Sequence, residues 1–165
     1  MRIETDLKLD FDDVLIRPKR STLTSRKEVD LYRTFKFRNG GSYHGIPVMA
    51  ANMDGVGTLE VGETLSDLDL FTCYKKDICE EGLIQVLKKD KSRHAAVTIG
   101  RNNRDYEKLI RIKKELFPHY KLVNICVDVA NGYSQAFVDL IKVVRKTFPG
   151  SNVIAGNVVT GEMVE

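Results

Sequence analysis

The sequence predicts an α/β fold built on a parallel β-sheet, and three features of the chain lead to that prediction. Short apolar runs of strand length alternate with longer segments whose apolar residues recur every three or four positions, as in amphipathic helices. This alternation occurs five times between residues 46 and 165, with short connections. Polar and glycine residues gather directly after the strand-like runs, which is where parallel α/β sheets place their ligands.

The clearest strand–helix unit begins at residue 123. The run 123–129 is mostly apolar and rich in β-branched residues, which predicts a strand buried on both faces. A polar turn with Asn131 and Gly132 follows, and then one apolar stripe on a helical period. The stripe residues are Tyr133, Phe137, Leu140, Ile141, Val144 and Phe148. Asp128 is therefore predicted to lie at the carboxyl end of a strand.

Four further strands follow from the same pattern. They are predicted at 46–51, 70–73, 95–99 and 152–155. Thr58 is a candidate cap for the helix after the first strand, and Pro118 ends the helix after the third. Another helix is predicted to begin at 160–163.

Residues 1–45 do not follow this pattern. Apolar residues on one face of the segment 29–37 predict an extended strand, and 39–41 is a strong turn signal, so a hairpin is expected there. We therefore expect one domain over 1–165, in which an N-terminal extension and hairpin (1–45) closes one end of five βα units (46–165).

An open doubly wound sheet and a section of a TIM barrel both satisfy this alternation. The chain has no G-x-G-x-x-G after its first strand and no G-x-x-x-x-G-K-[ST] motif, so the phosphate signatures of the open folds are missing. This favours a TIM (β/α)8 barrel. A closed barrel needs eight strands. The prediction is therefore an incomplete TIM barrel with only the first five strands and their helices, and with unpaired sheet edges.

The composition excludes several classes of protein. The chain is 42% hydrophobic and 30% charged with a net charge of +3, and its basic residues are scattered among acids, which argues against a nucleic-acid partner. The N-terminus does not have the pattern of a signal peptide, and no run approaches the length of a membrane span. Three cysteines without C-x-x-C spacing favour reduced thiols over a metal site. A soluble, cytoplasmic protein without a membrane partner is expected.

Asp128 and Lys76 stand out among the polar residues after the strands. A charge beside a buried strand end costs free energy unless it is partnered, so either a ligand or a neighbouring charge is expected there. The other polar residues at these positions also suit ordinary turns and caps. The basic stretch 19–26 suits a solvated loop, or a phosphate clasp through Ser25 and Arg26.

Four collinear segments resemble GMP reductases of the IMP dehydrogenase/GMP reductase family. They are 7–23 (LKLDFDDVLIRPKRSTL), 51–54 (ANMD), 128–134 (DVANGYS) and 155–163 (AGNVVTGEM). The resemblance implies a TIM-barrel oxidoreductase of purine salvage. Such an enzyme reductively deaminates GMP to IMP and ammonia with NADPH, usually as a homotetramer and with a monovalent cation, potassium. IMP dehydrogenases typically carry an inserted domain after the second strand, for which no room exists between Cys73 and Leu83.

The resemblance also implies roles for individual residues. Dinucleotide contacts fall on Ser25, Arg26, Lys76, Asp128, Val129 and Ala130. Substrate-pocket candidates are Asn52, Met53, Asp54 and Asn157. The family's catalytic cysteine follows the sixth strand, so neither it nor the potassium site is expected in this chain. Cys73, Cys79 and Cys126 do not match its context.

The chain departs from the family pattern at three places. Gly55 replaces a usual threonine, Lys75-Lys76-Asp77-Ile78 replaces a His-Lys-His-Tyr run, and Arg101 puts a bulky cation in a loop that is normally small. Three hypotheses follow. The first is the N-terminal portion of a GMP reductase with partial cofactor contacts and no catalytic centre of its own. The alternatives are a truncated non-catalytic paralogue that binds nucleotide or full-length subunits, and an IMP dehydrogenase-like fragment.

Overall fold

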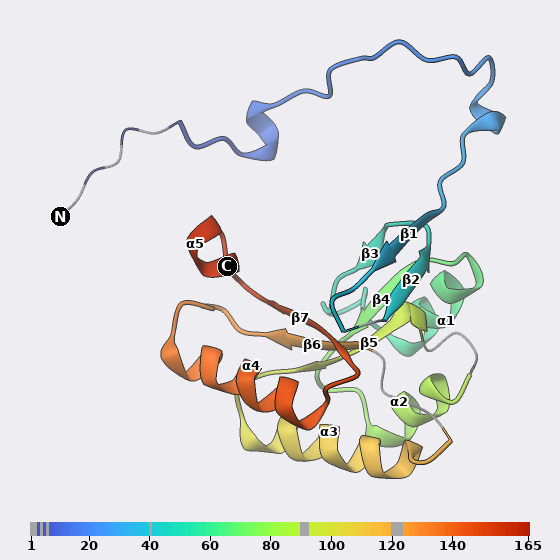
Figure 1. Ribbon diagram of the computed structural model, residues 1–165. Coiled ribbons are helices and arrows are strands. Elements are labelled where there is room, and N and C mark those ends of the chain that lie inside the picture. Colours follow the sequence, from blue (N-terminus) through green and yellow to red (C-terminus); the bar gives the residue numbers. More distant parts are fainter. Residues whose placement is uncertain (1–2, 4, 6, 40, 90–92, 120–123) are drawn as a thin grey trace. The chain divides into compact units, whose positions relative to one another are not determined.

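The computed structural model describes residues 3, 5, 7–39, 41–89, 93–119 and 124–165 (Figure 1). Val123, the first residue of the predicted run 123–129, lies outside the described residues. The chain divides into two units, Met1–Asp30 and Leu31–Glu165. In the first unit the described backbone is mainly extended and contains two short 3-10 turns, Phe11–Asp13 and Arg26–Glu28.

The second unit is an α/β structure built on a curled parallel sheet. Its strands are β3 (Met49–Ala50), β4 (Phe71–Tyr74), β5 (Ala95–Ile99), β6 (Asn124–Asp128) and β7 (Asn152–Gly156). They pair in the order β3-β4-β5-β6-β7, and every pairing is parallel. This sequential order confirms the five predicted strand–helix repeats.

The helices that connect the strands cover one face of this sheet. They are α1 (Leu59–Asp67), α2 (Glu80–Leu87), α3 (Asn103–Leu116) and α4 (Gln135–Thr147), and the short α5 (Gly161–Val164) follows β7 (Figure 1). The predicted cap of α1 is confirmed, because the Thr58 hydroxyl accepts a hydrogen bond from Val61 N at 3.2 Å. None of the helices among the described residues is long and apolar enough to cross a membrane.

The main core lies between these helices and the sheet. It includes Val97, Ile99, Ile125 and Val127 from the strands, and Leu109, Ile112, Phe137 and Val144 from the helices. All of these side chains are buried. The alternation of strand side chains places Phe71, Cys73, Ala96 and Cys126 on the opposite face, in a second, smaller cluster.

Several element boundaries differ from the prediction, and two of them have a clear local cause. The first strand was expected over 46–51, but only Met49–Ala50 pairs with β4. Pro47 has no N–H, and Val48 N bonds Ile46 O at 2.8 Å in a tight turn, so neither residue donates to β4, although Val48 O still accepts a hydrogen bond from Phe71 N at 3.1 Å. Tyr133 was expected on the stripe of the fourth helix, but it precedes α4 because Ser134 caps that helix.

The predicted hairpin is present as β1 (Arg33–Lys36) and β2 (Ser42–Gly45), which pair antiparallel. It packs at the amino ends of the parallel strands. Tyr43 Oη donates a hydrogen bond to Ile46 O at 2.6 Å, and the centroids of the Tyr43 and Phe71 rings lie 5.8 Å apart. His44 O bonds His94 Nε2 at 2.9 Å, just before β5. The carboxyl ends of the strands are therefore left free of the hairpin.

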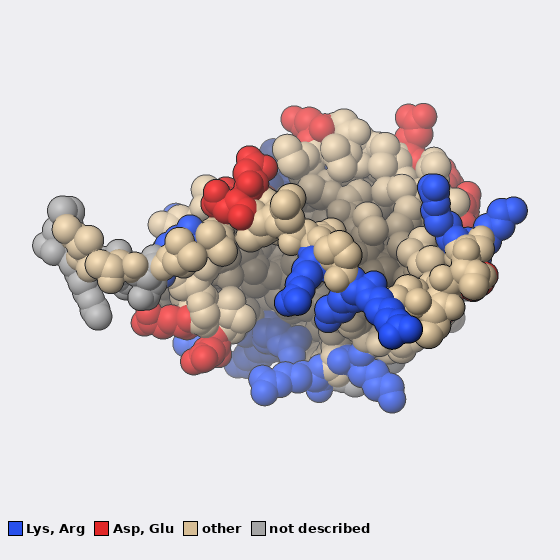
Figure 2. Space-filling model, turned by 90° about the horizontal axis from the view of Figure 1, so that it is seen from above, with Lys and Arg blue, Asp and Glu red and all other residues tan. Residues whose placement is uncertain are grey.

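Figure 2 shows one face of the molecule with its charged side chains. On that face the described Lys and Arg side chains lie in several separate groups, and Asp and Glu side chains occupy other parts of it. The distribution of charge on this face therefore does not by itself indicate a binding site for an anion.

Candidate functional site

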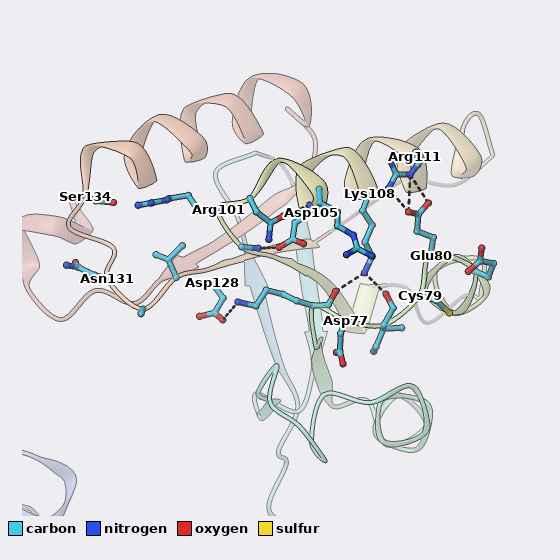
Figure 3. A pocket seen from close by; sticks show the side chains of 18 residues that line it. Asp77, Cys79, Glu80, Arg101, Asp105, Lys108, Arg111, Asp128, Asn131 and Ser134 are labelled. Carbon is cyan, nitrogen blue, oxygen red and sulfur yellow. Dashed lines mark hydrogen bonds and ion pairs between the residues drawn. The ribbon is translucent and has the colours of Figure 1, made fainter.

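A pocket of about 1050 Å³ lies at the carboxyl ends of β4, β5 and β6 (Figure 3). It is lined by 76–81, by Gly100, Arg101, Asn102, Arg104, Asp105, Lys108 and Arg111, and by 128–131 with Ser134. The lining thus comes from the loops after three neighbouring strands, from the first turn of α2, from the first three turns of α3 and from the residue that caps α4. This is the end of a parallel sheet at which ligands bind.

Asp128 contacts the loops that follow β3 and β4. Its Oδ2 accepts a hydrogen bond from Asn52 Nδ2 at 2.9 Å and lies 3.3 Å from Lys76 Nζ. The side chains of Lys76 and Asp128 remain 43% and 30% exposed. The Asp128 carboxylate, which was expected to need a partner, therefore has one in Lys76. The side chains of both residues still line the pocket.

The segment after β6 is held by the segment after β7. Val129 N donates to Gly156 O at 2.9 Å, and Asn157 N donates to Val129 O at the same distance. Asn157 Nδ2 adds a second bond to Val129 O at 3.1 Å. Asn157 therefore positions Val129 and Ala130, which line the pocket, and is not itself among the lining residues.

Two of the residues that depart from the family pattern pair with each other. Lys75 Nζ lies 3.0 Å from Asp77 Oδ2 and 3.2 Å from Asp54 Oδ1. Hydrogen bonds with Asp77 and then Asp54 raise the pKa of Lys75 above its usual range, and the bond with Lys75 lowers the pKa of Asp77. The two ion pairs of Lys75 tie the loop after β4 to the loop after β3.

The loop after β5 is fixed by α3. Gly100 N donates to Asp105 Oδ2 at 2.7 Å, and a Cβ at Gly100 would lie only 3.0 Å from that oxygen. Lys108 Nζ donates to Lys76 O at 2.9 Å and also to Ile78 O, and burial lowers its pKa. Asp105 and Lys108 were missed by the sequence reasoning. The only signal in the sequence was the spacing of a helix cap, in which Asp105 follows Asn102 by three residues. In the structure Asn102 Oδ1 accepts a hydrogen bond from Asp105 N at 2.7 Å.

The other candidate residues fall into two groups. Ser25 and Arg26 belong to the Met1–Asp30 unit, where Ser25 Oγ accepts a hydrogen bond from Lys27 N at 3.3 Å and caps a short turn. Asn52, Met53 and Asp54 follow β3 and do not line the pocket, although Asn52 reaches it through Asp128.

The cysteines lie away from this pocket, except for Cys79 at its rim. Cys73 and Cys126 are buried on the helix-free face of the sheet. A hydrogen bond with Cys126, together with burial, raises the pKa of Cys73, so this side chain is a thiol and not a thiolate nucleophile. Among the described residues, no group of three or more His, Cys, Asp or Glu side chains is placed to hold a metal ion.

Comparison with known proteins identifies the family. Residues 8–165 match the family described as "IMP dehydrogenase / GMP reductase domain". The chain is 49% identical over 169 residues to GMP reductase of Tolumonas auensis, covering 100% of this chain and 48% of that protein. It is 50% identical to human GMP reductase 2, covering 99% of this chain and 47% of that protein. The chain thus spans about half the length of these relatives.

A solved structure has the same fold. Inosine 5′-monophosphate dehydrogenase from Legionella pneumophila superposes with a TM-score of 0.69 at 22% identity, over 91% of this chain and 44% of that one. The sequence match covers almost the whole chain, and the fold agrees with it. The chain therefore belongs to the IMP dehydrogenase/GMP reductase domain family.

Proposed function

We propose that this chain provides the cofactor-binding part of a GMP reductase, which reductively deaminates GMP to IMP and ammonia with NADPH in purine salvage. The relatives at about 50% identity are named GMP reductases. The observation that carries the proposal is the Asp128–Lys76 pair at the carboxyl ends of the strands, beside an 1050 Å³ pocket. In the family architecture, the five parallel strands are the first five of a closed TIM barrel.

The residues of the pocket fit a dinucleotide. The Asp128 carboxylate accepts hydrogen bonds from amide or sugar groups, and Lys76 offers an ammonium group to a phosphate. α3 and α4 present their N-termini to the same pocket, where the helix dipole favours anions. When bound, NADPH supplies the hydride; Asp128, Lys76, Val129 and Ala130 bind and orient it.

The remaining candidates have supporting roles in this proposal. Asn52, Met53, Asp54 and Asn157 lie on the loops after β3 and β7 and are proposed to face the purine substrate. Ser25 and Arg26 are proposed to reach a cofactor bound by another subunit of a homotetramer. Reduced cysteines favour a cytoplasmic location. Neither the catalytic cysteine nor the potassium site of the family is proposed among these 165 residues.

The experiment is a calorimetric titration of the chain with NADPH, compared with Asp128→Asn. We expect saturable binding that weakens about tenfold in the variant, because a charge-assisted hydrogen bond is lost. Asp139→Asn is the matched control, because Asp139 lies on α4 and bonds only Gln135 among the described residues. Equal affinity in the chain and in Asp128→Asn would contradict the proposal.

A further inference from the structure

We propose that Met49, Cys73 and Cys126 form a site for one soft metal ion, Cu(I), on the helix-free face of the sheet. The three sulfur atoms come from β3, β4 and β6, so a bound ion links three strands. None of the three residues lines the pocket proposed for NADPH. The site therefore adds a binding activity that does not depend on the proposed function.

The three sulfur atoms already lie together. Cys73 Sγ donates a hydrogen bond to Met49 Sδ at 3.4 Å, and a hydrogen bond also joins the thiols of Cys73 and Cys126. A metal ion about 2.3 Å from each of three sulfur atoms, at the centre of a planar triangle, spaces those atoms about 4 Å apart. The spacing of Met49 and Cys73 is only slightly shorter, so small side-chain rotations are enough to admit the ion.

The pairing of the strands explains why these side chains meet. Met49 lies opposite Phe71 in the β3–β4 pair, and Cys73 follows Phe71 by two residues, so all three point to the same face. The strand between the two cysteine strands is β5. It contributes Ala96 to the same buried cluster as both cysteines. Because the side chain of Ala96 is a single methyl group, it leaves space for the two thiols to approach each other across β5.

The chemistry of the three side chains selects the kind of ion. Two thiols and a thioether are soft ligands, which favour Cu(I) over hard cations such as Mg²⁺ and Ca²⁺. Structural Zn²⁺ sites almost always have four protein ligands, and this cluster offers three. Among the described residues, no three His, Cys, Asp or Glu side chains form a metal site, so the methionine sulfur is what completes this one.

Binding is an exchange of protons for the ion. Cys73 and Cys126 are both reduced, and their side chains are 3% and 7% exposed. Each thiol sulfur forms a bond to Cu(I) and releases its proton to water; the copper keeps its oxidation state and no other reactant is needed. Met49 is 51% exposed and lines a groove of about 840 Å³ with Phe71 and Ile154. The ion can therefore reach the buried thiols from this groove.

The test is a titration of the chain with the coloured Cu(I)–bicinchoninate complex under anaerobic, reducing conditions. The loss of colour measures the copper transferred to the protein, and we expect one tightly held ion per chain. Cys73→Ser and Cys126→Ser should each weaken binding at least about a hundredfold, since loss of a group that merely supports a metal ligand already costs about 10–100-fold. Met49→Leu should weaken it about tenfold, because a thioether is a weaker ligand than a thiolate.

Two variants serve as matched controls. Cys79→Ser removes the exposed thiol, and Met163→Leu removes a thioether from α5. Neither should change the affinity for Cu(I). Met49→Leu keeps the volume of a half-exposed side chain, so it should fold even if a buried serine is not tolerated. It therefore keeps the test decisive.

X-ray absorption at the copper edge identifies the ligands in the unmodified chain. We expect three sulfur neighbours and a rise of the melting temperature with bound copper, because the ion binds only the folded arrangement. The proposal would be overturned if no copper were transferred, if Cys79→Ser abolished the transfer, or if nitrogen or oxygen neighbours were found. Equal affinity in Met49→Leu, or displacement of the ion by a tenfold excess of Zn²⁺, would also overturn it. Each of these outcomes leaves the binding of NADPH untouched.

Discussion

The Glu80–Arg111 pair gives the clearest pH dependence of any single interaction in the pocket. The hydrogen bonds from Arg111 lower the pKa of Glu80 below its usual value. A carboxyl group with a lowered pKa stabilises the fold above the pKa of the unfolded chain, about 4.3. This stability is lost as the pH falls through the lower pKa of the folded state. Because Arg111 is 50% exposed, screening by solvent keeps this contribution small.

Glu80→Gln should therefore lower the free energy of unfolding near neutral pH, and the difference from the unmodified chain should shrink at pH values below about 4. Urea denaturation at the two pH values measures it. Glu81→Gln is the control, because Glu81, unlike Glu80, has no ion pair among the described residues. A difference that is the same at both pH values would show that the ion pair is not its cause.

The three cysteines should differ strongly in reactivity. Cys79 is exposed, whereas Cys73 and Cys126 are buried. The hydrogen bond between the two buried thiols, together with burial, raises the pKa of Cys73. With a thiol reagent at neutral pH, we expect one thiol to react fast and two to react only after unfolding. The fast phase should disappear in Cys79→Ser. A fast phase that survives in this variant would mean that the buried pair is accessible.

Some site residues could be predicted from the sequence, and others could not. Asp128 and Lys76 could, because a charge directly after a buried strand needs a partner at the same sheet edge. Lys108 and Arg111 could not, because they lie one and two turns into a helix and face the pocket only through the packing of α3 beside α2.

At the scale of the elements, the contact between α1 and β4 depends on Gly62. A Cβ at Gly62 would lie 2.3 Å from Tyr74 Oη and 2.5 Å from Tyr74 Cε1. Tyr74 is 1% exposed and cannot move away easily. Gly62→Ala should therefore destabilise the protein by about 1–3 kcal/mol through overpacking, although alanine favours the helix. The loss of free energy of unfolding can be measured by urea denaturation.

Two comparisons isolate the cause of this loss. Gly150→Ala should change stability by no more than about 1 kcal/mol, because a Cβ there meets no atom within 4 Å. Adding Tyr74→Phe to Gly62→Ala should restore part of the stability, since it removes the closest atom. A fully stable Gly62→Ala variant would contradict the packing of α1 on β4.

The elements themselves were largely predictable, because apolar periodicity reports which face of a helix or strand is buried. The third strand of the sheet was placed at the same residues, 95–99, that form β5. The boundaries that failed depend on local hydrogen bonds, which periodicity does not record. Asn131 Oδ1 accepts from Tyr133 N at 2.9 Å and keeps Tyr133 in the turn before α4.

At the scale of the whole molecule, the unpaired edges of the sheet determine how the chain behaves in solution. Among the described residues, β3 pairs only with β4, and β7 only with β6. Unpaired edges beside apolar surface promote association. We therefore expect the mass measured by sedimentation to rise with concentration. Ala155→Lys, which places a charge on β7, should weaken this association, whereas Gln135→Lys on α4 should not. A constant monomeric mass would contradict the expectation.

The central claim is that the carboxyl ends of β4, β5 and β6 bind the dinucleotide. Amide chemical-shift mapping of the isotope-labelled chain during titration with NADPH tests it most directly, because every loop is observed at once. We predict that the largest shifts occur in 76–81, 100–105 and 128–134, and that the hairpin 33–45 at the opposite end of the strands is unaffected. Shifts confined to the hairpin, or no saturable shifts at all, would contradict the account.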